Sequence, residues 1–368
     1  TGAALGGPGK LDNLGEGAVW QGGDVLRSLL SSLHGGATLP VVPVPAGVHA
    51  TLRPYQEQGL NWLQFLRTHG LAGVLADDMG LGKTLQTLIH IQVEKDAGRL
   101  TDPALIIAPV SLMGNWAREA ARFCPGLRCL VLHGADRHHA AGALADHDIV
   151  IAPYSLLHRD RERWLAQPWH LVVLDEAQNI KNASTHAAQV VGQLQARHRL
   201  CLSGTPMENH LGEVWSLFHF LMPGFLGSQQ RFKEVFRNPI EKLGDTARLA
   251  QLRARITPFM LRRTKALVAS ELPPKVESVM AVELSGAQAD LYETIRLGTE
   301  KAVREALQSK GLAKSQITIL DALLKLRQVC CDPQLVPLDA ARKVKGSAKL
   351  EQLMTLLPGM LAEGRRIL

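Results

Sequence analysis

Residues 77–84, DDMGLGKT, place two glycines before a lysine and a threonine. Glycine has no Cβ, so the main chain can turn its N–H groups toward an anion and approach it closely. Lys83 can then reach the terminal phosphates of a nucleotide as a point charge, and the Thr84 hydroxyl can bind Mg²⁺. The strict pattern G-x-x-x-x-G-K-[ST] is not met, because Asp77 occupies the place of its first glycine. The Gly-x-Gly-Lys-Thr core nevertheless predicts a phosphate-binding turn.

A pair of carboxylates follows further along the chain. The four apolar residues Leu171–Leu174 predict a buried strand, and Asp175 and Glu176 come directly after it. Open α/β sheets bind ligands at the carboxyl ends of their strands, so both side chains are expected at that edge. In this place Asp175 would hold Mg²⁺, and Glu176 would orient and activate a water molecule.

A third polar group has two interpretations. Ser203 and Thr205 follow another predicted strand, within the sequence Ser-Gly-Thr-Pro. In one interpretation their hydroxyls lie at the same sheet edge and sense the terminal phosphate. In the other, these residues form a plain turn, which the motif by itself would favour.

These residues require a sheet whose strands all end on one side. Short apolar runs alternate with helical patterns from Leu52 onward, which predicts an α/β fold with an open, mainly parallel sheet and helices on both faces. The expected strands cover residues 73–76, 104–109, 129–133, 148–152, 171–174 and 200–203, and the helices between them include 85–94 and 112–123.

The remainder of the chain is expected to be helical. No strand is predicted between about residue 208 and a proline-rich joint at 272–275, and the helices there and beyond have amphipathic patterns. The joint and the β-prone residues behind it, up to Leu284, predict a hinge. The last segment is expected to be helical until Gly364 and then to begin an apolar strand. The predicted helices cover 213–221, 248–259, 288–307 and 317–330, with a further one at 24–33 near the start.

Composition and charge limit the class of protein. Hydrophobic residues make up 46% of the 368 residues, enough for sizeable cores, which excludes a disordered or collagen-like chain. The longest candidate for a membrane segment, 38–52, is broken by three prolines, so no membrane segment is expected. The net charge of +7 is concentrated in residues 231–275, which carry eleven Lys and Arg against four Asp and Glu. This basic segment indicates either contact with a polyanion or a solvated helical face.

Other conspicuous side chains have structural interpretations. The five cysteines match neither a zinc pattern nor a disulfide framework, so reduced, buried or half-buried thiols are expected. The fourteen histidines lack a matching set of metal ligands and are expected in loops or at the surface. Trp116 and Trp215 are expected to anchor a core rather than to stack on bases.

The order of motifs resembles that of the Swi/Snf-type ATPases, a branch of the superfamily-two helicases that includes chromatin remodellers and bacterial DNA translocases. The resemblance covers about residues 50–368. Gln178 stands where the family commonly has His. The matching segments are LRPYQEQG (52–59), DDMGLGKT (77–84), PVSLMGNWARE (109–119), DIVIAPYSLL (148–157), DEAQNIKN (175–182), SGTPMEN (203–209), FLMPGFLG (220–227), PFMLRRTK (258–265) and ELPPK (271–275).

The resemblance implies roles for the residues in these segments. Gln56 would hydrogen-bond the adenine of ATP, with Mg²⁺ held by Thr84 and Asp175. The remaining contacts to ATP would come from Asp78, Met79, Gly80, Leu81, Gly82, Lys83 and Thr84. Catalysis would depend on Lys83, Thr84, Asp175 and Glu176, and coupling on Gln178, Ser203 and Thr205. DNA would contact Ser111, Asn115, Tyr154, Lys181 and Asn182.

The resemblance also implies a division into domains. Residues 1–48 would be an N-terminal segment with a proline-rich linker, and 49–268 a RecA-like ATP-binding first lobe with a helical insertion at about 210–258. A hinge would span 269–284, and 285–368 would be a helical protrusion and the truncated start of a second lobe. Arg262, Arg263 and Lys265 lie near the hinge and are assigned to hinge or inter-lobe work.

The function implied is that of an ATP-dependent translocase on double-stranded DNA, with this chain as the ATP-binding half. The second motor lobe would supply arginine fingers, each worth about 10³ to 10⁵ in turnover, so the chain alone is expected to hydrolyse ATP poorly. Three alternatives stay open: an ATPase that displaces RNA polymerase or another protein from DNA, a strand-separating helicase, and a nucleotide-gated scaffold without enzymatic activity. Without targeting signals, a cytoplasmic, nucleoid-associated place is expected.

Overall fold

The computed structural model of the chain describes residues 39–133, 144–183, 185–204, 210–268 and 277–367. The chain divides into two units, which we call unit 1 (residues 1–273) and unit 2 (residues 274–368). The predicted helix at 24–33 lies outside the described residues. No helix in the described ranges is long and apolar enough to cross a membrane.

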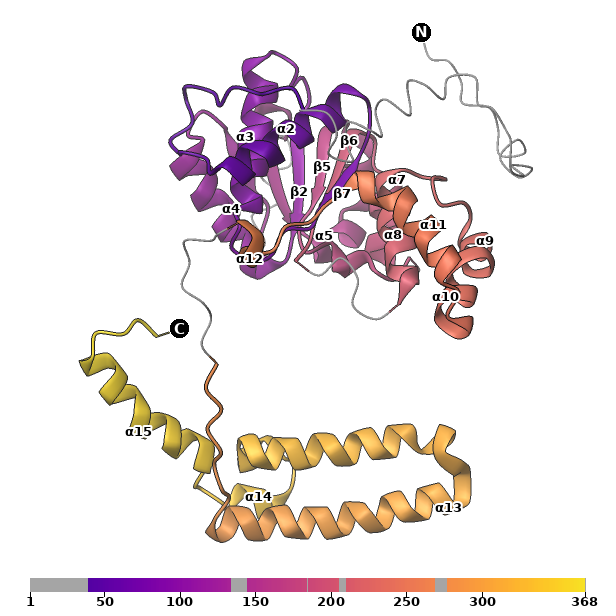
Figure 1. The fold of residues 1–368 in the computed structure, drawn as a ribbon. Helices are drawn as coiled ribbons and strands as arrows, with labels where there is room; N and C mark the ends of the chain where they lie inside the picture. Colours follow the sequence, from indigo (N-terminus) through magenta and orange to yellow (C-terminus); the bar gives the residue numbers. More distant parts are fainter. Residues whose placement is uncertain (1–38, 134–143, 184, 205–209, 269–276, 368) are drawn as a thin grey trace. The chain divides into compact units, whose positions relative to one another are not determined.

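Unit 1 is built on one seven-stranded sheet in the order β3-β4-β2-β5-β6-β1-β7 (Figure 1). Every pair of neighbouring strands is parallel, so all strands end at the same edge. The strands are β1 (Gly73–Leu75), β2 (Ala104–Ala108), β3 (Cys129–Val131), β4 (Ile149–Pro153), β5 (Trp169–Leu174), β6 (Ala196–Leu202) and β7 (Met260–Leu261). The predicted α/β class with a parallel sheet is confirmed.

Strand β7 corrects the expectation that strands end near residue 208. It pairs with β1 through Val74 and Leu75 and forms one edge of the sheet. Its two residues are too few to produce a recognisable alternation of apolar and polar side chains. Its pairing partner is distant in sequence, and tertiary contact therefore decides this strand.

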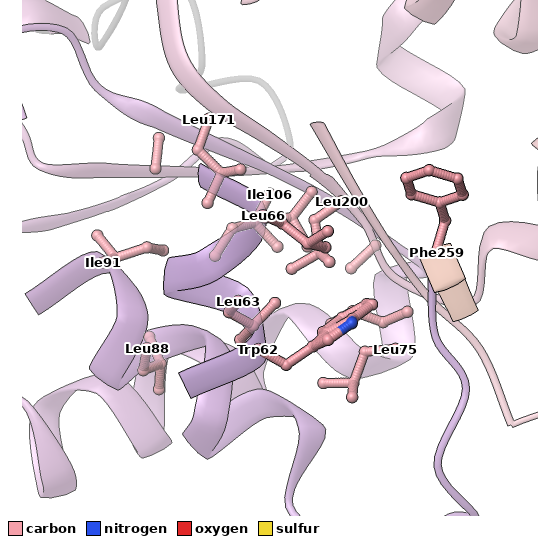
Figure 2. Packing of buried hydrophobic residues seen from close by; sticks show 14 of the residues in the cluster. Trp62, Leu63, Leu66, Leu75, Leu88, Ile91, Ile106, Leu171, Leu200 and Phe259 are labelled. Carbon is pink, nitrogen blue, oxygen red and sulfur yellow. The ribbon is translucent and has the colours of Figure 1, made fainter. Parts of the chain in front are cut away.

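Helices cover both faces of the sheet, and side-chain alternation along the strands explains why both faces are apolar. On one face Leu75 and Ile106 pack against helices α2, α3 and α4. Figure 2 shows this packing around Trp62. On the other face Val74 and Leu105 pack against α5, α6 and α7. The bounds are α2 (Pro54–Thr68), α3 (Lys83–Asp96), α4 (Val110–Phe123), α5 (Tyr154–Arg159), α6 (Arg161–Ala166), η2 (Ala177–Ile180) and α7 (His186–Gln193).

A helical insertion follows β6, as the sequence indicates. It consists of α8 (Leu211–Leu221), α9 (Gln229–Phe232), η3 (Lys233–Arg237), α10 (Asn238–Leu243), α11 (Thr246–Ile256) and η4 (Thr257–Phe259), and α12 (Lys265–Val268) follows β7. Trp215 is buried in α8 and its indole donates to the carbonyl of Gly227 at 3.1 Å, a core position as expected. Most of the lysines and arginines of the basic segment 231–268 are exposed, with Arg263 the buried exception.

Unit 2 is helical, with α13 (Gly286–Cys331), η5 (Pro333–Leu335), α14 (Asp339–Arg342) and α15 (Ala348–Ala362). The two predicted helices 288–307 and 317–330 lie in α13, which is broken by the left-handed backbone of Gly311, φ 73°. Residues 277–285 contain no strand, and none follows Gly364 within the described residues. A β-prone run forms no strand without a neighbouring strand to accept its hydrogen bonds.

Three histidines contradict the expectation of surface or loop positions. His90 and His170 are buried and His198 is half-buried, all around the carboxylate of Glu94. The Glu94 carboxylate lies 3.1 Å from His170 Nε2 and accepts from Arg99 at 2.7 Å and Gln64 at 3.0 Å. Because α3 brings Glu94 to the start of β5, a charged residue finds enough partners to be buried. We call this the Glu94 cluster.

Candidate nucleotide-binding site

The phosphate loop joins the carboxyl end of β1 to the first turn of α3. Gly80 and Gly82 have φ values of 84° and 79°, in the left-handed region that favours glycine. A Cβ on Gly82 would lie 2.5 Å from Nε2 of Gln56, so a larger residue would strain the left-handed backbone and displace the Gln56 amide. The loop is therefore shaped as the motif predicts, with the amino end of a fourteen-residue helix directly behind it.

Lys83 is held inside this loop. Its ammonium donates to the main-chain carbonyl of Asp77 at 2.6 Å and more weakly to that of Asp78 at 3.4 Å. Burial lowers the pKa of Lys83, while the charges of nearby carboxylates, Glu176 first among them, oppose that shift. The cation thus lies close to both carboxylates at the end of β5, where a phosphate can be held between the lysine and a metal ion.

Gln56 connects helix α2 to the phosphate loop. Its Oε1 accepts from the main-chain N–H of Arg53 at 3.0 Å, and its Nε2 donates to the carbonyl of Leu81 at 3.2 Å. The side chain is buried. In this structure one end of the amide bonds to the loop and the other to the start of α2, and the predicted contact to adenine stays a prediction.

The Asp77 side chain is the fully buried anchor of the loop, and its partner is Arg263. The Arg263 side chain donates to Asp77 Oδ1 at 2.9 Å, to Asp77 Oδ2 and to Gln86 Oε1 at 2.9 Å. It also donates to the carbonyl of Tyr55 and lies over the Tyr55 ring, 5.3 Å from its centroid. All of these Arg263 partners lie in unit 1. This corrects the assignment of Arg263 to a hinge or inter-lobe role.

The neighbours of Arg263 lie differently. Arg262 is exposed, and the main-chain N–H of Lys265 donates to Asp78 Oδ2 at 3.0 Å. The main chain of β7 and the residues after it thus hold both aspartates at the start of the phosphate loop. Sequence reasoning missed this anchor because the two partners are 186 residues apart; the replacement of glycine by Asp77 was the only signal.

Asp175 follows β5 directly and is largely buried, with 8% of its surface exposed. Its Oδ1 accepts from the N–H of Glu176 at 3.0 Å, and its Oδ2 accepts from the Trp116 indole at 2.8 Å. Burial raises the pKa of Asp175, and the hydrogen bond from Trp116 counteracts this. Trp116 is a core residue as expected, but its contact with the carboxylate was not predicted.

Glu176 has a left-handed backbone, with φ 49°, alone among the described non-glycine residues. Such a conformation costs on the order of 1–3 kcal/mol and persists only where the surroundings fix it. Its carboxylate accepts from Gln178 Nε2 at 2.7 Å, and Gln178 Oε1 accepts from the Ser203 hydroxyl at 3.0 Å. Gln178 therefore joins the end of β5 to the residue after β6. Thr205 and the rest of 205–209 lie outside the described residues.

The remaining loop residues lie around this edge. Met79 is exposed, and a Cβ on Gly204 would lie 3.2 Å from its Cγ, so the phosphate loop contacts the Ser203 segment. Thr84, the second residue of α3, is half-buried. No three described His, Cys, Asp or Glu residues are grouped to hold a metal ion by themselves. Mg²⁺ bound by one carboxylate, a threonine and nucleotide phosphates fits this donor set, because magnesium normally takes few protein ligands.

The five predicted DNA contacts lie on different elements. Ser111 is exposed on the first turn of α4, and Asn115 donates to Glu119 at 2.6 Å. The Tyr154 hydroxyl points inward and donates to the carbonyl of Asp175 at 2.8 Å. Lys181 is half-buried and Asn182 is exposed, both after η2. The first turn of α4 and the segment after η2 therefore offer accessible polar groups, while the Tyr154 hydroxyl is used internally.

Fold and site together define a RecA-like nucleotide-binding core, with a phosphate loop after β1 and two carboxylates after β5, the strands on either side of β6 in a parallel sheet. The model of the SNF2-related domain matches residues 55–335. The chain belongs to this family, within the helicase-like ATPases that its motifs predict.

Three similar proteins illustrate the range of the family. The chain is 41% identical over 353 residues to the "Putative ATP-dependent helicase/translocase YwqA" of Bacillus subtilis, covering 93% of this chain and 38% of YwqA. It is 35% identical over 340 residues to the ISWI chromatin-remodeling complex ATPase ISW1 of Saccharomyces cerevisiae, covering 88% of this chain and 30% of ISW1. The Sulfolobus solfataricus SWI2/SNF2 ATPase core, solved in complex with dsDNA, matches with a TM-score of 0.61 and 38% identity over 89% of this chain and 68% of that one.

Proposed function

We propose that this chain is the ATP-binding half of a motor that translocates on double-stranded DNA. The observation that carries the proposal is the convergence of Lys83, Asp175 and the hydrogen-bonded series Glu176–Gln178–Ser203 at one sheet edge. Support for the DNA substrate comes from the similar S. solfataricus core, which was solved with dsDNA.

Different residues of the chain would bind the phosphates, hold Mg²⁺ and activate the attacking water. The N–H groups of the phosphate loop and Lys83 would bind the phosphates, and Asp77 with its partner Arg263 would keep the loop in place. Mg²⁺, held by Thr84, Asp175 and the nucleotide, would neutralise charge on the phosphates. Glu176 would orient and deprotonate the attacking water, and its hydrogen bond from Gln178 would set the direction of the carboxylate.

Ser203 would report the state of this site to the rest of the lobe. Its hydroxyl donates to Gln178, and its main-chain N–H donates to the carbonyl of Leu75 at the end of β1. A change at the terminal phosphate that moves Glu176 would therefore reach β6. Coupling of this kind needs a discrete structural link, and here the link is a continuous series of hydrogen bonds.

Contacts to DNA would fall mainly on phosphates and be independent of sequence. Ser111 and Asn182 are exposed, and the basic residues of the helical insertion add positive charge to the same unit. Binding of duplex DNA should then fall by about 10³-fold between 50 and 200 mM salt if about six phosphates are contacted. Fluorescence anisotropy of a labelled duplex tests this, and affinity that does not change with salt would contradict it.

A second RecA-like lobe would be needed for efficient turnover, and the chain spans less than two fifths of the length of YwqA.

Two other functions share the same ATP site: displacement of RNA polymerase or another protein from DNA, and strand separation. A translocase with both lobes is expected to use ATP to displace the third strand from a DNA triplex, without releasing a strand of the duplex. Release of the duplex strand would instead show a helicase. The same proposal places the protein in the cytoplasm on the nucleoid.

A further inference from the structure

The carboxylate of Asp175 is positioned from outside its own strand. Trp116 Nε1 donates to Oδ2 at 2.8 Å, and the two side chains are 1% and 8% exposed. The other oxygen accepts from the N–H of Glu176. An indole N–H can only donate, and a buried carboxylate needs donors, so this bond fixes the torsion angle of the Asp175 side chain.

Trp116 belongs to the helix that carries two of the predicted DNA contacts. Helix α4 starts at the carboxyl end of β2 with Ser111 exposed in its first turn, and Asn115 directly precedes Trp116. Asn115 donates to Glu119 at 2.6 Å. Burial raises the pKa of Glu119, the hydrogen bond from Asn115 opposes this shift, and the charge of Asp175 adds to it. One helix thus presents polar groups to solvent near its start and an indole donor to the metal-binding carboxylate.

A second element, the start of α5 after β4, also contacts Asp175. Tyr154, which begins α5 at the end of β4, donates its hydroxyl to the Asp175 carbonyl at 2.8 Å. Strand β2 pairs with β5, and β4 pairs with the far side of β2, so the helices that follow these two strands both bond to Asp175. Of the two, only Trp116 contacts the carboxylate itself.

We infer that Trp116 is a positioning residue that couples helix α4 to the Mg²⁺ site, so that DNA bound at the start of α4 changes how Asp175 holds the metal ion. The inference rests on the proposed function, because it requires Mg²⁺ at Asp175 and DNA at α4. Residues that orient a metal ligand typically change metal affinity by about 10–100-fold when they are removed. Trp116 would give the site its response to DNA.

The test is the Mg²⁺ dependence of binding of a fluorescent ATP analogue to the 368-residue chain, with and without a DNA duplex. In Trp116→Phe, the Mg²⁺ concentration at half-saturation should rise about tenfold and no longer respond to DNA, while the affinity in EDTA should stay unchanged. The matched control is Trp164→Phe, which removes an equally buried indole that donates to the carbonyl of Leu156 at 3.1 Å, away from Asp175.

The outcomes separate the inference from the proposed function. A folded Trp116→Phe with the Mg²⁺ midpoint and DNA response of the control would overturn the inference and leave the function intact. A wild-type midpoint that ignores DNA would overturn the coupling. A wild-type chain that binds no nucleotide at any Mg²⁺ concentration would overturn the function and the inference together. If Trp116→Phe does not fold, 3-benzothienylalanine at position 116 keeps the ring shape without the N–H, and the same outcomes apply.

Discussion

The Gln178 side chain joins two chemically different groups. One is the carboxylate of Glu176, whose backbone is left-handed, and the other is the hydroxyl of Ser203 at the end of the next strand. Gln178 donates to Glu176 and accepts from Ser203, so its amide uses both of its functional ends. Gln178 stands where the family commonly has His, and its amide has a fixed donor and a fixed acceptor. The bridge therefore does not depend on protonation of a ring between pH 5 and 8.

Substitution of the bridge should affect hydrolysis more than binding. In Gln178→Ala, single-turnover hydrolysis of bound ATP is expected to slow by about tenfold or more, because Glu176 loses the donor that orients it for water. The affinity for ATP should change less than about twofold, since the described hydrogen bonds of the Gln178 side chain go to Glu176 and Ser203 and not to the phosphate loop. Gln167→Ala is the control, because the half-buried Gln167 amide donates to the neighbouring carbonyl of Pro168 and has no described hydrogen bond to the site. Equal rates in the two variants would contradict this role.

At this scale the sequence predicted residue types better than contacts. Lys83, Asp175 and Glu176 could be assigned because their motifs are local and follow apolar strands. The bond between Trp116 and Asp175 could not, because it joins residues 59 positions apart across two elements. Gln56 was expected to face a ligand. In this structure its amide accepts from Arg53 at the start of α2 and donates to Leu81 in the phosphate loop.

Among the elements, β7 and the residues that follow it hold the phosphate loop. The Arg263 side chain donates to the fully buried Asp77, and the carbonyls of Leu261 and Arg263 accept from the main-chain N–H groups of Ala76 and Asp78. A two-residue edge strand thus places one guanidinium, that of Arg263, against the buried Asp77. The sequence pattern gave no indication of this strand, because so short an edge strand carries no periodicity.

Removal of the guanidinium should destabilise unit 1 strongly. Arg263→Ala is expected to lower the free energy of unfolding by about 3–5 kcal/mol, because Asp77 would stay buried without its charged partner. The neighbouring exposed Arg262→Ala should change it by less than about 0.5 kcal/mol. Urea unfolding followed by tryptophan fluorescence measures both. Similar small losses in the two variants would show that Arg263 is not the anchor of the loop.

The Glu94 cluster makes unit 1 sensitive to acid. Burial lowers the pKa of His90 from 6.5 to about 4, with Glu94 opposing and His198, His170 and Arg67 adding to the shift. Burial alone would raise the pKa of Glu94, but hydrogen bonds from His170, Arg99 and Gln64 lower it. Below about pH 6.5 histidines of the unfolded chain bind protons, whereas His90 in the folded cluster stays neutral down to about pH 4. The stability present at neutral pH is therefore lost as the pH falls toward 4.

This predicts a pH-dependent unfolding free energy. Between pH 7 and 4 the loss from His90 alone should be on the order of 3 kcal/mol, since one pKa unit corresponds to about 1.4 kcal/mol. His90→Met should reduce the slope over this range, and the exposed His49→Met should not. Urea unfolding at several pH values measures the slopes. A slope that His90→Met leaves unchanged would assign the acid sensitivity to other groups.

In the whole molecule, the two units have very different cores. Both large hydrophobic clusters lie in unit 1, and the chain from Leu39 to Val48 packs against one of them. The unit 2 cluster has six buried members, and α15 exposes Leu350, Leu353, Met354 and Leu361. Composition predicted that the chain could form sizeable cores, but the uneven distribution of apolar contacts depends on the tertiary fold.

Unit 1 should therefore fold and bind nucleotide by itself. Residues 39–268 contain every described residue of the site, so their affinity for a fluorescent ATP analogue in Mg²⁺ is expected to lie within about twofold of that of the whole chain, as for a pre-formed site. Residues 277–368 alone should unfold with little cooperativity, because a small core contributes little stability. Circular dichroism and the binding assay test both parts. Loss of nucleotide binding in folded residues 39–268 would place part of the site in unit 2.

We propose that the phosphate loop binds ATP through Lys83, with Mg²⁺ at the end of β5. The most direct measurement is equilibrium binding of ATP to the chain and to Lys83→Ala, each in Mg²⁺ and in EDTA, with the exposed Lys242→Ala as the control. The structure predicts Mg²⁺-dependent binding that the control retains and Lys83→Ala loses by about 100-fold or more, as expected for a buried cation on phosphate. Equal binding by Lys83→Ala and the control, or binding that EDTA does not weaken, would contradict this assignment.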